Sequence, residues 1–112
     1  MRTFDRNYGC PVEFAVEALG GKWKTVILAR LKQTPMRFGE LRALIPALSD
    51  KMLSERLRDL VALGLAETHE NGGVSRYRLT ARGASLQPVL QALYDWGSAN
   101  ADAMGARVAP AP

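Results

Sequence analysis

The chain has 112 residues, of which 47% are hydrophobic, and carries a formal net charge of +4 at pH 7. This length suits one globular domain and leaves no room for a second. The longest run without a charged residue, 83–94, is too short to cross a bilayer, and the N-terminus has charges in place of the apolar core of a signal peptide. We therefore expect a cytoplasmic protein that makes no membrane contact.

The residue types that usually carry catalysis are scarce. Cys10 and His69 are the only cysteine and histidine, so we expect neither an internal disulfide framework nor a cluster of metal ligands. The chain also has no glycine-rich phosphate loop and no Cys/His pair close in sequence. These features argue against an enzyme and against a metal or other cofactor.

The first half of the chain has the pattern of three short helices. Pro11 is well placed in the first turn of a helix that stops at Gly20-Gly21. A second helix is predicted over 22–32, where Gln33-Thr34-Pro35 breaks it, and a third over 38–44. The side chains expected on the buried face of the second helix are Trp23, Val26, Ile27 and Leu31.

A longer helix and a hairpin follow without a gap. Ser49 is a good N-cap, because its hydroxyl can accept from an early backbone N–H, and Gly64 can end the helix. Strands are predicted over 65–70 and 74–79, joined by a turn at 71–73. After the short helix before it, this order predicts a winged helix-turn-helix, a mainly α (α+β) fold with a two-stranded wing. The apolar stripe of the longer helix comprises Leu53, Leu57, Leu60 and Val61.

Basic residues are concentrated in the centre of the sequence. Between Lys22 and Arg58 there are nine basic and three acidic residues, a net charge of +6 against +4 for the whole chain. A basic region beside a wing favours double-stranded DNA as partner, because neutralised phosphates release condensed counterions. Each basic residue taken singly is equally compatible with a solvated surface charge. Only the concentration of nine basic residues in one region indicates a DNA-binding surface.

The two ends of the chain are less regular than its centre. A last helix is predicted from the N-cap Thr80 to Trp96, and Pro88 inside its pattern indicates either a kink or a later start. We divide the chain into a flexible arm over 1–9, a domain over 10–97 and a flexible Ala/Pro-rich tail over 98–112.

Several short motifs follow one another in a fixed order. They are Cys10-Pro11-Val12, Gly20-Gly21-Lys22-Trp23, Arg37-Phe38-Gly39-Glu40-Leu41, Lys51-Met52-Leu53, Gly64-Leu65, Tyr77-Arg78-Leu79-Thr80 with Gly83, and Tyr94-Asp95-Trp96-Gly97. In this order they resemble the HxlR family of bacterial transcriptional regulators, a branch of the MarR-like winged-helix proteins. The resemblance covers about Cys10 to Gly97.

The resemblance implies a homodimer whose N- and C-terminal helices build the interface and whose two lobes bind a roughly palindromic operator. The residues agree, because these helices offer more apolar surface than one small core needs. The alternative is that both helices pack on their own lobe. In a dimer, the two recognition helices would enter successive major grooves about 34 Å apart. The expected interface residues are Val12, Phe14, Leu86, Val89, Leu90, Leu93 and Trp96.

Base readout is expected from the free face of the helix that follows Ser49. Its lysine and arginines can reach guanine acceptors or phosphates, Glu55 can accept from a cytosine amino group, and Met52 can touch a thymine methyl. Arg56 points nearer the core edge and is expected to pair with an acid or a phosphate. The recognition residues are Ser49, Lys51, Met52, Ser54, Glu55, Arg56 and Arg58. Contacts to the DNA backbone or minor groove are expected from Arg37, Asn71, Arg76 and Arg78.

Cys10 directly precedes Pro11 and so falls at the N-cap of the first helix, where the positive end of the dipole stabilises a thiolate. Such a thiol reacts with oxidants or small electrophiles. The resemblance supports this use, since the matching cysteine of several HxlR members senses disulfide stress, quinones or aldehydes. The alternative is an inert thiol packed in the dimer interface.

These features predict a sequence-specific DNA-binding transcriptional regulator that acts as a homodimer, by default as a repressor, with Cys10 as a candidate sensor of oxidants or electrophiles. The alternative is a winged helix used only as a protein-interaction module, since the fold also serves that purpose. RNA is disfavoured, because the sequence has no exposed aromatic platform of the kind that single-strand readers use.

Overall fold

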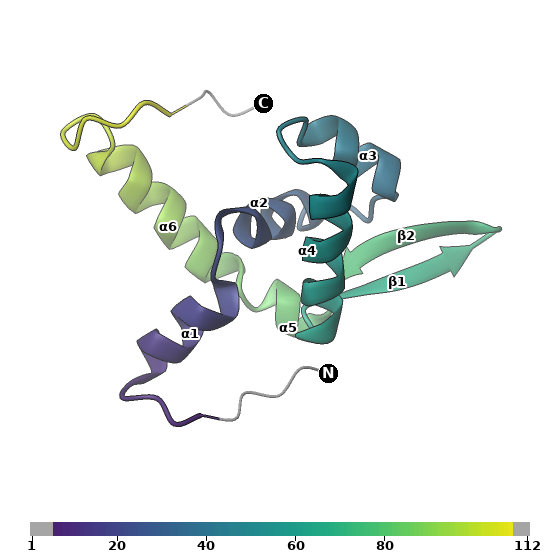
Figure 1. The fold of residues 1–112 in the computed structure, drawn as a ribbon, viewed down its shortest axis with the longest axis horizontal. Coiled ribbons are helices and arrows are strands. Elements are labelled where there is room, and N and C mark those ends of the chain that lie inside the picture. Colours follow the sequence, from purple (N-terminus) through teal and green to yellow (C-terminus); the bar gives the residue numbers. More distant parts are fainter. Residues whose placement is uncertain (1–5, 109–112) are drawn as a thin grey trace.

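A computed structural model describes residues 6–108 of the chain. The elements, in chain order, are α1 (Pro11–Leu19), α2 (Lys22–Leu31), α3 (Phe38–Leu44), α4 (Asp50–Ala62), β1 (Ala66–Asn71), β2 (Val74–Leu79), α5 (Ala81–Ala84) and α6 (Gln87–Asn100). Figure 1 shows α2, α3 and α4 gathered beside the hairpin, with α1 and α6 on the side away from it. This arrangement confirms the predicted mainly α fold with a two-stranded wing and further helices at both ends.

The hydrophobic core lies where α2, α3 and α4 meet the base of the hairpin. Trp23 and Val26, expected on the buried face of α2, are half-buried and pack against this core, while Ile27 and Leu31 lie inside it. Leu28 was missed by the sequence pattern and is fully buried. The largest fully buried side chains are Ile27, Leu28, Leu41, Leu48, Leu53, Leu57 and Leu60.

The predicted apolar stripe of α4 is wrong at one position. Leu53, Leu57 and Leu60 are fully buried, but Val61 is 41% exposed. Val61 follows Leu60 by one residue, which turns its side chain by about 100° around the helix axis and away from the core. The buried face of α4 is therefore narrower than predicted.

α4 begins and ends where the sequence predicts. The Ser49 hydroxyl accepts a hydrogen bond from the Met52 backbone N–H at 3.1 Å, which satisfies a donor that has no partner within the helix. At the other end Gly64 adopts a φ of 74°, and the Leu65 N–H donates to the Leu60 carbonyl at 3.0 Å. This left-handed C-cap turns the chain sharply into the wing.

The wing is a regular antiparallel hairpin. β1 and β2 pair from Ala66 opposite Leu79 to Asn71 opposite Val74, and the two glycines between them have φ values of 60° and 78°. Positive φ at both turn residues matches the right-handed twist of the strands. β1 begins one residue later than predicted, because the backbone of Leu65 is used to close α4.

A short segment before α3 joins the hairpin. Met36 and Tyr77 exchange two backbone hydrogen bonds of 2.9 and 2.7 Å, so β2 lies between β1 and this segment. This pairing attaches the start of α3 to the wing.

The stretch predicted as one helix from Thr80 to Trp96 divides into α5 and α6. The Thr80 hydroxyl accepts from the Gly83 N–H at 3.0 Å and donates to the Gly64 carbonyl at 2.6 Å, which caps α5 and fastens it to the end of α4. Pro88 falls in the first turn of α6, where a missing N–H is tolerated. Of the two alternatives that Pro88 left open, the later start is correct.

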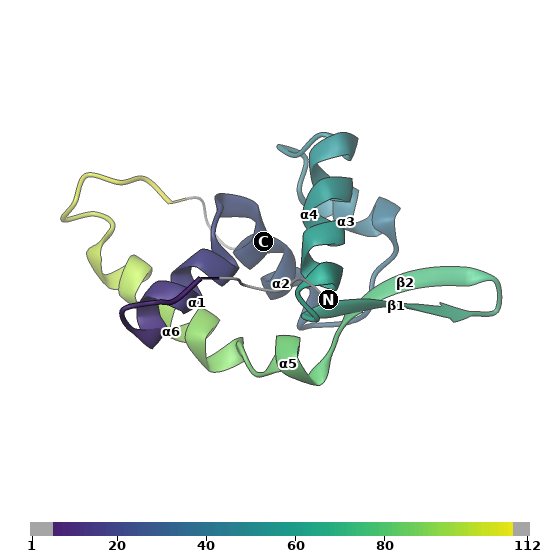
Figure 2. The same ribbon diagram turned by 60° about the horizontal axis from the view of Figure 1, so that its bottom comes forward.

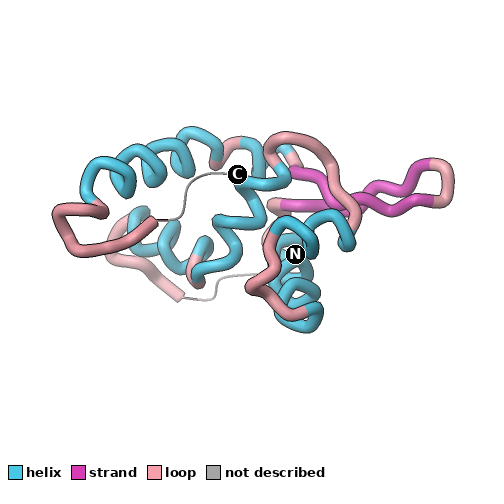
Figure 3. The backbone as a smooth tube through the Cα atoms, turned by 90° about the horizontal axis from the view of Figure 1, so that it is seen from above, coloured by secondary structure: helices cyan, strands magenta, loops and turns pink. Residues whose placement is uncertain are grey.

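α6 continues to Asn100, beyond the domain end predicted at Gly97. Residues 1–5 of the predicted arm and 109–112 of the predicted tail lie outside the described part of the chain. Among residues 6–108, no helix has both the length and the apolar character that crossing a membrane requires. Figures 2 and 3 show that the wing projects on the side opposite to α1 and α6 in every view.

Candidate nucleic-acid interface

The free face of α4 is open to solvent. Lys51 and Arg58 are exposed, and Met52 keeps 38% of its surface accessible. Ser54 and Glu55, which the sequence also assigns to this face, are half-buried. Side chains of both charges and one flexible apolar side chain are thus available along the first three turns of one helix.

Arg56 and Ser49 have structural roles in the free protein. Arg56 lies 3.3 Å from Asp59 and 3.9 Å from Glu55, which confirms the expectation that it pairs with an acid. Ser49 caps α4 through its hydroxyl while staying exposed. Both residues therefore stabilise α4, the helix that carries Lys51 and Arg58.

The start of α3 carries a charged cap. The Arg37 backbone N–H donates to Glu40 Oε1 at 2.8 Å, and the Arg37 Nε lies 3.4 Å from the same oxygen. The pKa of the Glu40 carboxyl is lowered, first by that backbone hydrogen bond and then by the positive charges of Arg37 and Arg76. The backbone pairing of Met36 with Tyr77, next to Arg76, places this part of the wing beside the start of α3.

A contact that the sequence did not predict joins α3 to α4. Arg42 donates from Nε to Asp50 Oδ1 at 2.6 Å and lies 3.5 Å from the Ile45 carbonyl. Asp50 is the first residue of α4, so this pair ties the two helices of the helix-turn-helix across their turn. The signal in the sequence is an arginine in the last turn of one helix followed by an acid at the start of the next, a spacing that many unrelated turns share.

The predicted wing residues share one face of the hairpin. Strand alternation places Arg76, Arg78 and Asn71 on the same side, with Arg76 opposite His69. Arg78 is opposite Glu67 and lies 3.3 Å from it. This face therefore presents two arginines, one of them already paired with an acid.

The apolar residues expected at an interface lie on α1 and α6. Val12, Leu93 and Trp96 are 69%, 54% and 61% exposed, whereas Leu86 and Leu90 are half-buried and pack against the core. Phe14 and Val89 are 40% and 43% exposed. Neither α1 nor α6 contains a fully buried residue.

Two further exposed apolar residues were not predicted. Val16 on α1 and Tyr94 on α6 are 65% and 62% exposed. Both lie outside the single stripe that helical periodicity assigns to each helix, so the pattern predicts them as solvent-facing positions without a function. The exposed apolar surface of the two terminal helices is larger than the sequence indicates.

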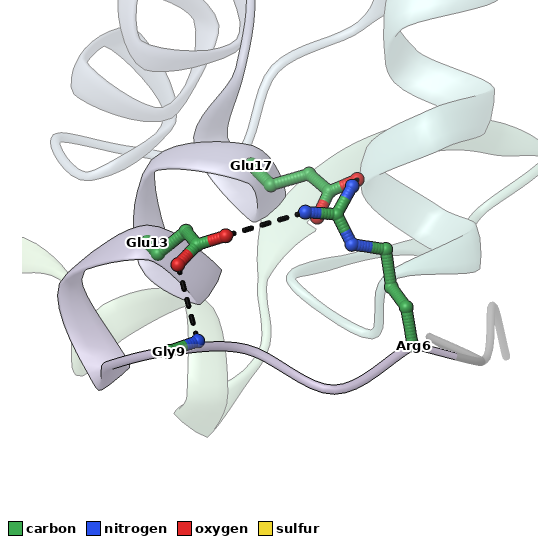
Figure 4. A network of polar contacts seen from close by, with 4 residues as sticks. All are labelled: Arg6, Gly9, Glu13 and Glu17. Atoms are coloured by element: carbon green, nitrogen blue, oxygen red, sulfur yellow. Dashed lines mark hydrogen bonds and ion pairs between the residues drawn. The ribbon is translucent and has the colours of Figure 1, made fainter.

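Cys10 is the exposed N-cap residue of α1, and its carbonyl accepts from the Glu13 N–H at 3.1 Å. The segment before it is held on the helix (Figure 4): the Gly9 N–H donates to Glu13 Oε2 at 3.1 Å, and Arg6 lies 3.4 Å from both Glu13 and Glu17. The thiol thus lies at the start of α1, and contacts of charged side chains hold the segment before it against the helix.

Comparisons with known proteins match this architecture. A family model described as HxlR-like helix-turn-helix matches residues 18–104. A relative from Methanothermobacter thermautotrophicus, named an HTH-type transcriptional regulator, is 41% identical over 96 residues, which cover 83% of this chain and 73% of the relative.

Two solved structures have the same fold. The redox regulator HypR in its reduced form has a TM-score of 0.77 at 33% identity, over 85% of this chain and 97% of HypR. Quinone-bound YodB from Bacillus subtilis has a TM-score of 0.71 at 37% identity, over 80% of this chain and 99% of YodB. None of these names refers to an enzyme.

Proposed function

The chain belongs to the HxlR-like helix-turn-helix family, and we propose that it is a transcriptional regulator that binds double-stranded DNA sequence-specifically as a homodimer. One observation carries the proposal: the face of α4 that holds Lys51 and Arg58 is exposed, and no other element of the described chain covers it. A protruding helix of this kind fits the major groove, where each base pair presents a distinct pattern of donors and acceptors.

Within this proposal the side chains divide into two groups. Lys51, Glu55 and Arg58 read base edges from α4, and Met52 contacts a thymine methyl. Arg37 at the start of α3 and the wing face contact phosphates or the minor groove and set the register of α4 on the duplex. The backbone pairing of Met36 with Tyr77 supports this division, since it joins the segment before α3 to the wing.

The test uses DNA fragments selected from the genome by the purified protein, followed by fluorescence anisotropy on the enriched sequence. We expect Lys51→Ala and Arg58→Ala to weaken specific binding by about 1–3 kcal/mol each, the value of a lost base contact. Arg107→Ala, which removes the same charge from an exposed residue beyond α6, is the matched control and should change affinity little. Equal effects of all three substitutions would indicate general charge attraction without base readout.

Salt dependence separates a DNA reader from a protein-interaction module. A dimer making about 6–10 phosphate contacts loses roughly 10³–10⁵ in affinity between 50 and 200 mM salt. A winged helix that binds a protein through apolar surface would show no such slope and no preference among duplexes.

We further propose that the bound dimer represses transcription. A small protein with one DNA-reading surface acts most simply by blocking the access of polymerase to a promoter. A reporter gene placed behind the selected operator should be more active in a strain that lacks the protein. Lower activity in that strain would instead identify an activator.

We also propose that Cys10 makes DNA binding responsive to oxidants or electrophiles. Cys10 is exposed at the start of α1, and structural neighbours include the redox regulator HypR and quinone-bound YodB. The Cys10 sulfur would add to a ring carbon of a quinone: a C–S bond forms, a ring C=C double bond opens, and the proton lost by the thiol is balanced by one gained at a quinone oxygen. Diamide would accept two electrons and two protons from two Cys10 thiols, which then form an intersubunit disulfide.

The test compares operator affinity before and after treatment with diamide or a quinone. We expect treatment to change the affinity of the wild-type protein and to leave that of Cys10→Ser unchanged. Equal operator affinity of treated and untreated wild-type protein would show that Cys10 is an inert thiol.

A further inference from the structure

The start of α4 carries an acidic side chain that an arginine of α3 holds in place. Arg42 Nε donates to Asp50 Oδ1 at 2.6 Å, and the same guanidinium lies 3.5 Å from the Ile45 carbonyl at the end of α3. Asp50 is the first residue of α4, and 77% of its side-chain surface stays exposed in the pair, against 34% for Arg42. The arginine is therefore the inner partner, and the carboxylate is the one that faces solvent.

The position of this carboxylate is fixed by the turn before it. Ile45 and Leu48 are 4% and 1% exposed, so the turn is packed on the core. The Ser49 hydroxyl caps the first turn of α4, and Arg42 holds one carboxylate oxygen. Within the described part of the chain, Asp50 Oδ2 forms no hydrogen bond or ion pair. A side chain that is already held loses little entropy on binding, so Oδ2 is a preorganised acceptor for a donor outside the chain.

Helix stability alone does not account for the arginine. The helix dipole stabilises an acidic residue in the first turn without any further partner, and an exposed ion pair contributes only about 0.2–1 kcal/mol. Close to DNA a carboxylate is unfavourable, because phosphates repel it, and the positive charge of Arg42 offsets part of that repulsion. A carboxylate at this end of α4 therefore favours DNA binding only where it meets a hydrogen-bond donor.

The major groove offers few donors to a carboxylate. Cytosine presents its N4 amino group and adenine its N6 amino group, whereas guanine and thymine present acceptor oxygens that repel a carboxylate. Adenine also presents the N7 acceptor beside its amino group, so cytosine suits a carboxylate better. In a helix-turn-helix, the N-terminal residues of the recognition helix contact base edges. As the first residue of α4, Asp50 is one of them.

We infer that Asp50 is a specificity-determining residue that accepts from the N4 amino group of a cytosine in each half-site, and that Arg42 is its positioning residue. The inference rests on the proposed sequence-specific DNA binding and adds a base contact to it. Arg42 stays on Oδ1 in the complex while Oδ2 accepts from the base. Because the carboxylate repels guanine and thymine at that position, the contact supplies discrimination more than affinity.

The experiment measures base preference at every operator position. Competition binding with duplexes that carry each of the four base pairs at each position compares the wild type with Asp50→Ala. The variant should lose a preference for cytosine of roughly 5- to 100-fold at one position in each half-site, the cost of a mismatched base pair, and keep its other preferences. Its affinity for a scrambled duplex should rise, because a negative charge near phosphates is gone.

Opposite changes in discrimination and in non-specific affinity separate a reading role from a structural one. If the pair with Arg42 only held the turn together, its loss would weaken binding to all duplexes alike and leave the preferences unchanged, which would overturn the inference. Asp59→Asn is the matched control, since it removes another carboxylate of α4 that pairs with an arginine, Arg56, at 3.3 Å. This control should keep the preference for cytosine.

A double-mutant cycle tests the role of Arg42. Arg42→Gln should reduce the preference for cytosine in the wild-type background and have no effect on it in the Asp50→Ala background, because a positioning residue acts only through the side chain that it holds. Arg42→Lys, which keeps the charge, should restore part of the preference. Equal effects of Arg42→Gln in both backgrounds would overturn the positioning role.

The outcomes separate this inference from the proposed function. If the wild type selects an operator and Asp50→Ala has the same preferences at every position, the inference fails and the proposed function stands. A wild type without any preference among duplexes would overturn both.

A second variant keeps the test valid if Asp50→Ala loses helix content in circular dichroism. Asp50→Asn keeps the shape of the side chain, and its amide can both donate and accept, as adenine requires. The preferred base at the same position should therefore change from cytosine to adenine. An unchanged preference for cytosine in Asp50→Asn would contradict the inference.

Discussion

The basic residues proposed to contact DNA differ in whether they already form an ion pair with an acidic side chain. Arg37 lies 3.4 Å from Glu40, and Arg78 lies 3.3 Å from Glu67. No salt bridge within residues 6–108 involves Lys51 or Arg58. Lys51 and Arg58 are thus free to reach DNA. Arg37 and Arg78, which are proposed to contact phosphates, must first leave their carboxylate partners.

This difference predicts that Glu67→Gln strengthens DNA binding. The substitution releases Arg78 and removes a negative charge from the face that would lie near phosphates. An exposed ion pair contributes about 0.2–1 kcal/mol, so we expect a gain of up to about fivefold at low salt. Anisotropy on the operator and on a scrambled duplex measures it, and the gain should appear on both, because phosphate contacts do not depend on sequence.

The matched control is Glu70→Gln, which removes the same charge from the opposite face of the hairpin, where its cross-strand neighbour is Ser75. Its gain should be smaller than that of Glu67→Gln. Equal gains from both substitutions would mean that only net charge matters and that the pair with Arg78 does not restrain binding.

Glu40 predicts an acid-sensitive cap at the start of α3. Its pKa is lowered from 4.5 by the hydrogen bond from the Arg37 backbone N–H, followed by the charges of Arg37 and Arg76. A carboxyl whose pKa is lower in the folded than in the unfolded protein stabilises the native state at every pH above its unfolded-state pKa. This stabilisation is lost as the pH falls through the folded-state pKa. The melting temperature of the wild type should exceed that of Glu40→Gln at about pH 6, and the difference should shrink toward about pH 3. A difference that does not change over this range would contradict the role of ionised Glu40.

At the scale of elements, α5 packs directly against the chain that leads from α4 to β1. A Cβ atom on Gly83 would lie 2.0 Å from the Leu65 carbonyl oxygen, and Gly83 is buried. Alanine normally stabilises a helix by about 1 kcal/mol relative to glycine. Here the sign should reverse, with Gly83→Ala lowering the free energy of unfolding by about 1–3 kcal/mol, as overpacking does.

Urea denaturation measures this change, and Gly39→Ala is the matched control. Gly39 is an exposed helical glycine in α3, and a Cβ atom added to it would meet nothing within 4 Å. Its replacement should leave stability unchanged or raise it by up to about 1 kcal/mol. A stable Gly83→Ala variant would show that α5 can move away from Leu65 without loss.

Local signals explain why most elements could be predicted. Ser49 and Gly64 act as caps through contacts within a few residues, and the two glycines of the wing supply the backbone angles that a tight turn needs. The division at Pro88 could not be resolved, because the residues around it continue a helical pattern. The hydrogen bond from the Thr80 hydroxyl to the Gly64 carbonyl, which fastens the start of α5 to the end of α4, joins residues too far apart in the sequence for a local pattern to reveal.

The candidate site shows the same limit. Periodicity correctly assigns Lys51 and Arg58 to the free face of α4, since the buried leucines fix the opposite face. Periodicity does not reveal the link from Arg42 to Asp50 or the pairing of Met36 with Tyr77, because both depend on how separate elements pack. That α4 reads bases, and that α1 and α6 form a dimer, stay predictions.

At the scale of the whole molecule, the wing and the terminal helices occupy opposite sides (Figure 2). The chain measures 48 × 38 × 24 Å along its principal axes. A dimer built through α1 and α6 therefore carries its two wings on the outside and one α4 in each lobe. Two rigidly joined lobes of this kind bind two half-sites whose separation the protein fixes.

This geometry predicts a strict dependence on half-site spacing. Successive major grooves on one side of a duplex are about 34 Å apart, or roughly 10–10.5 base pairs. Inserting about five base pairs between the half-sites turns one of them to the far side of the duplex, so only one lobe can bind and affinity should fall toward that of a single half-site. Inserting about ten base pairs returns both half-sites to the same side of the duplex but increases the distance between them. Affinity should then recover only if the link through α1 and α6 allows the two lobes to move that far apart. Anisotropy on the three duplexes measures this, and equal affinities would show that each lobe binds DNA independently of the other.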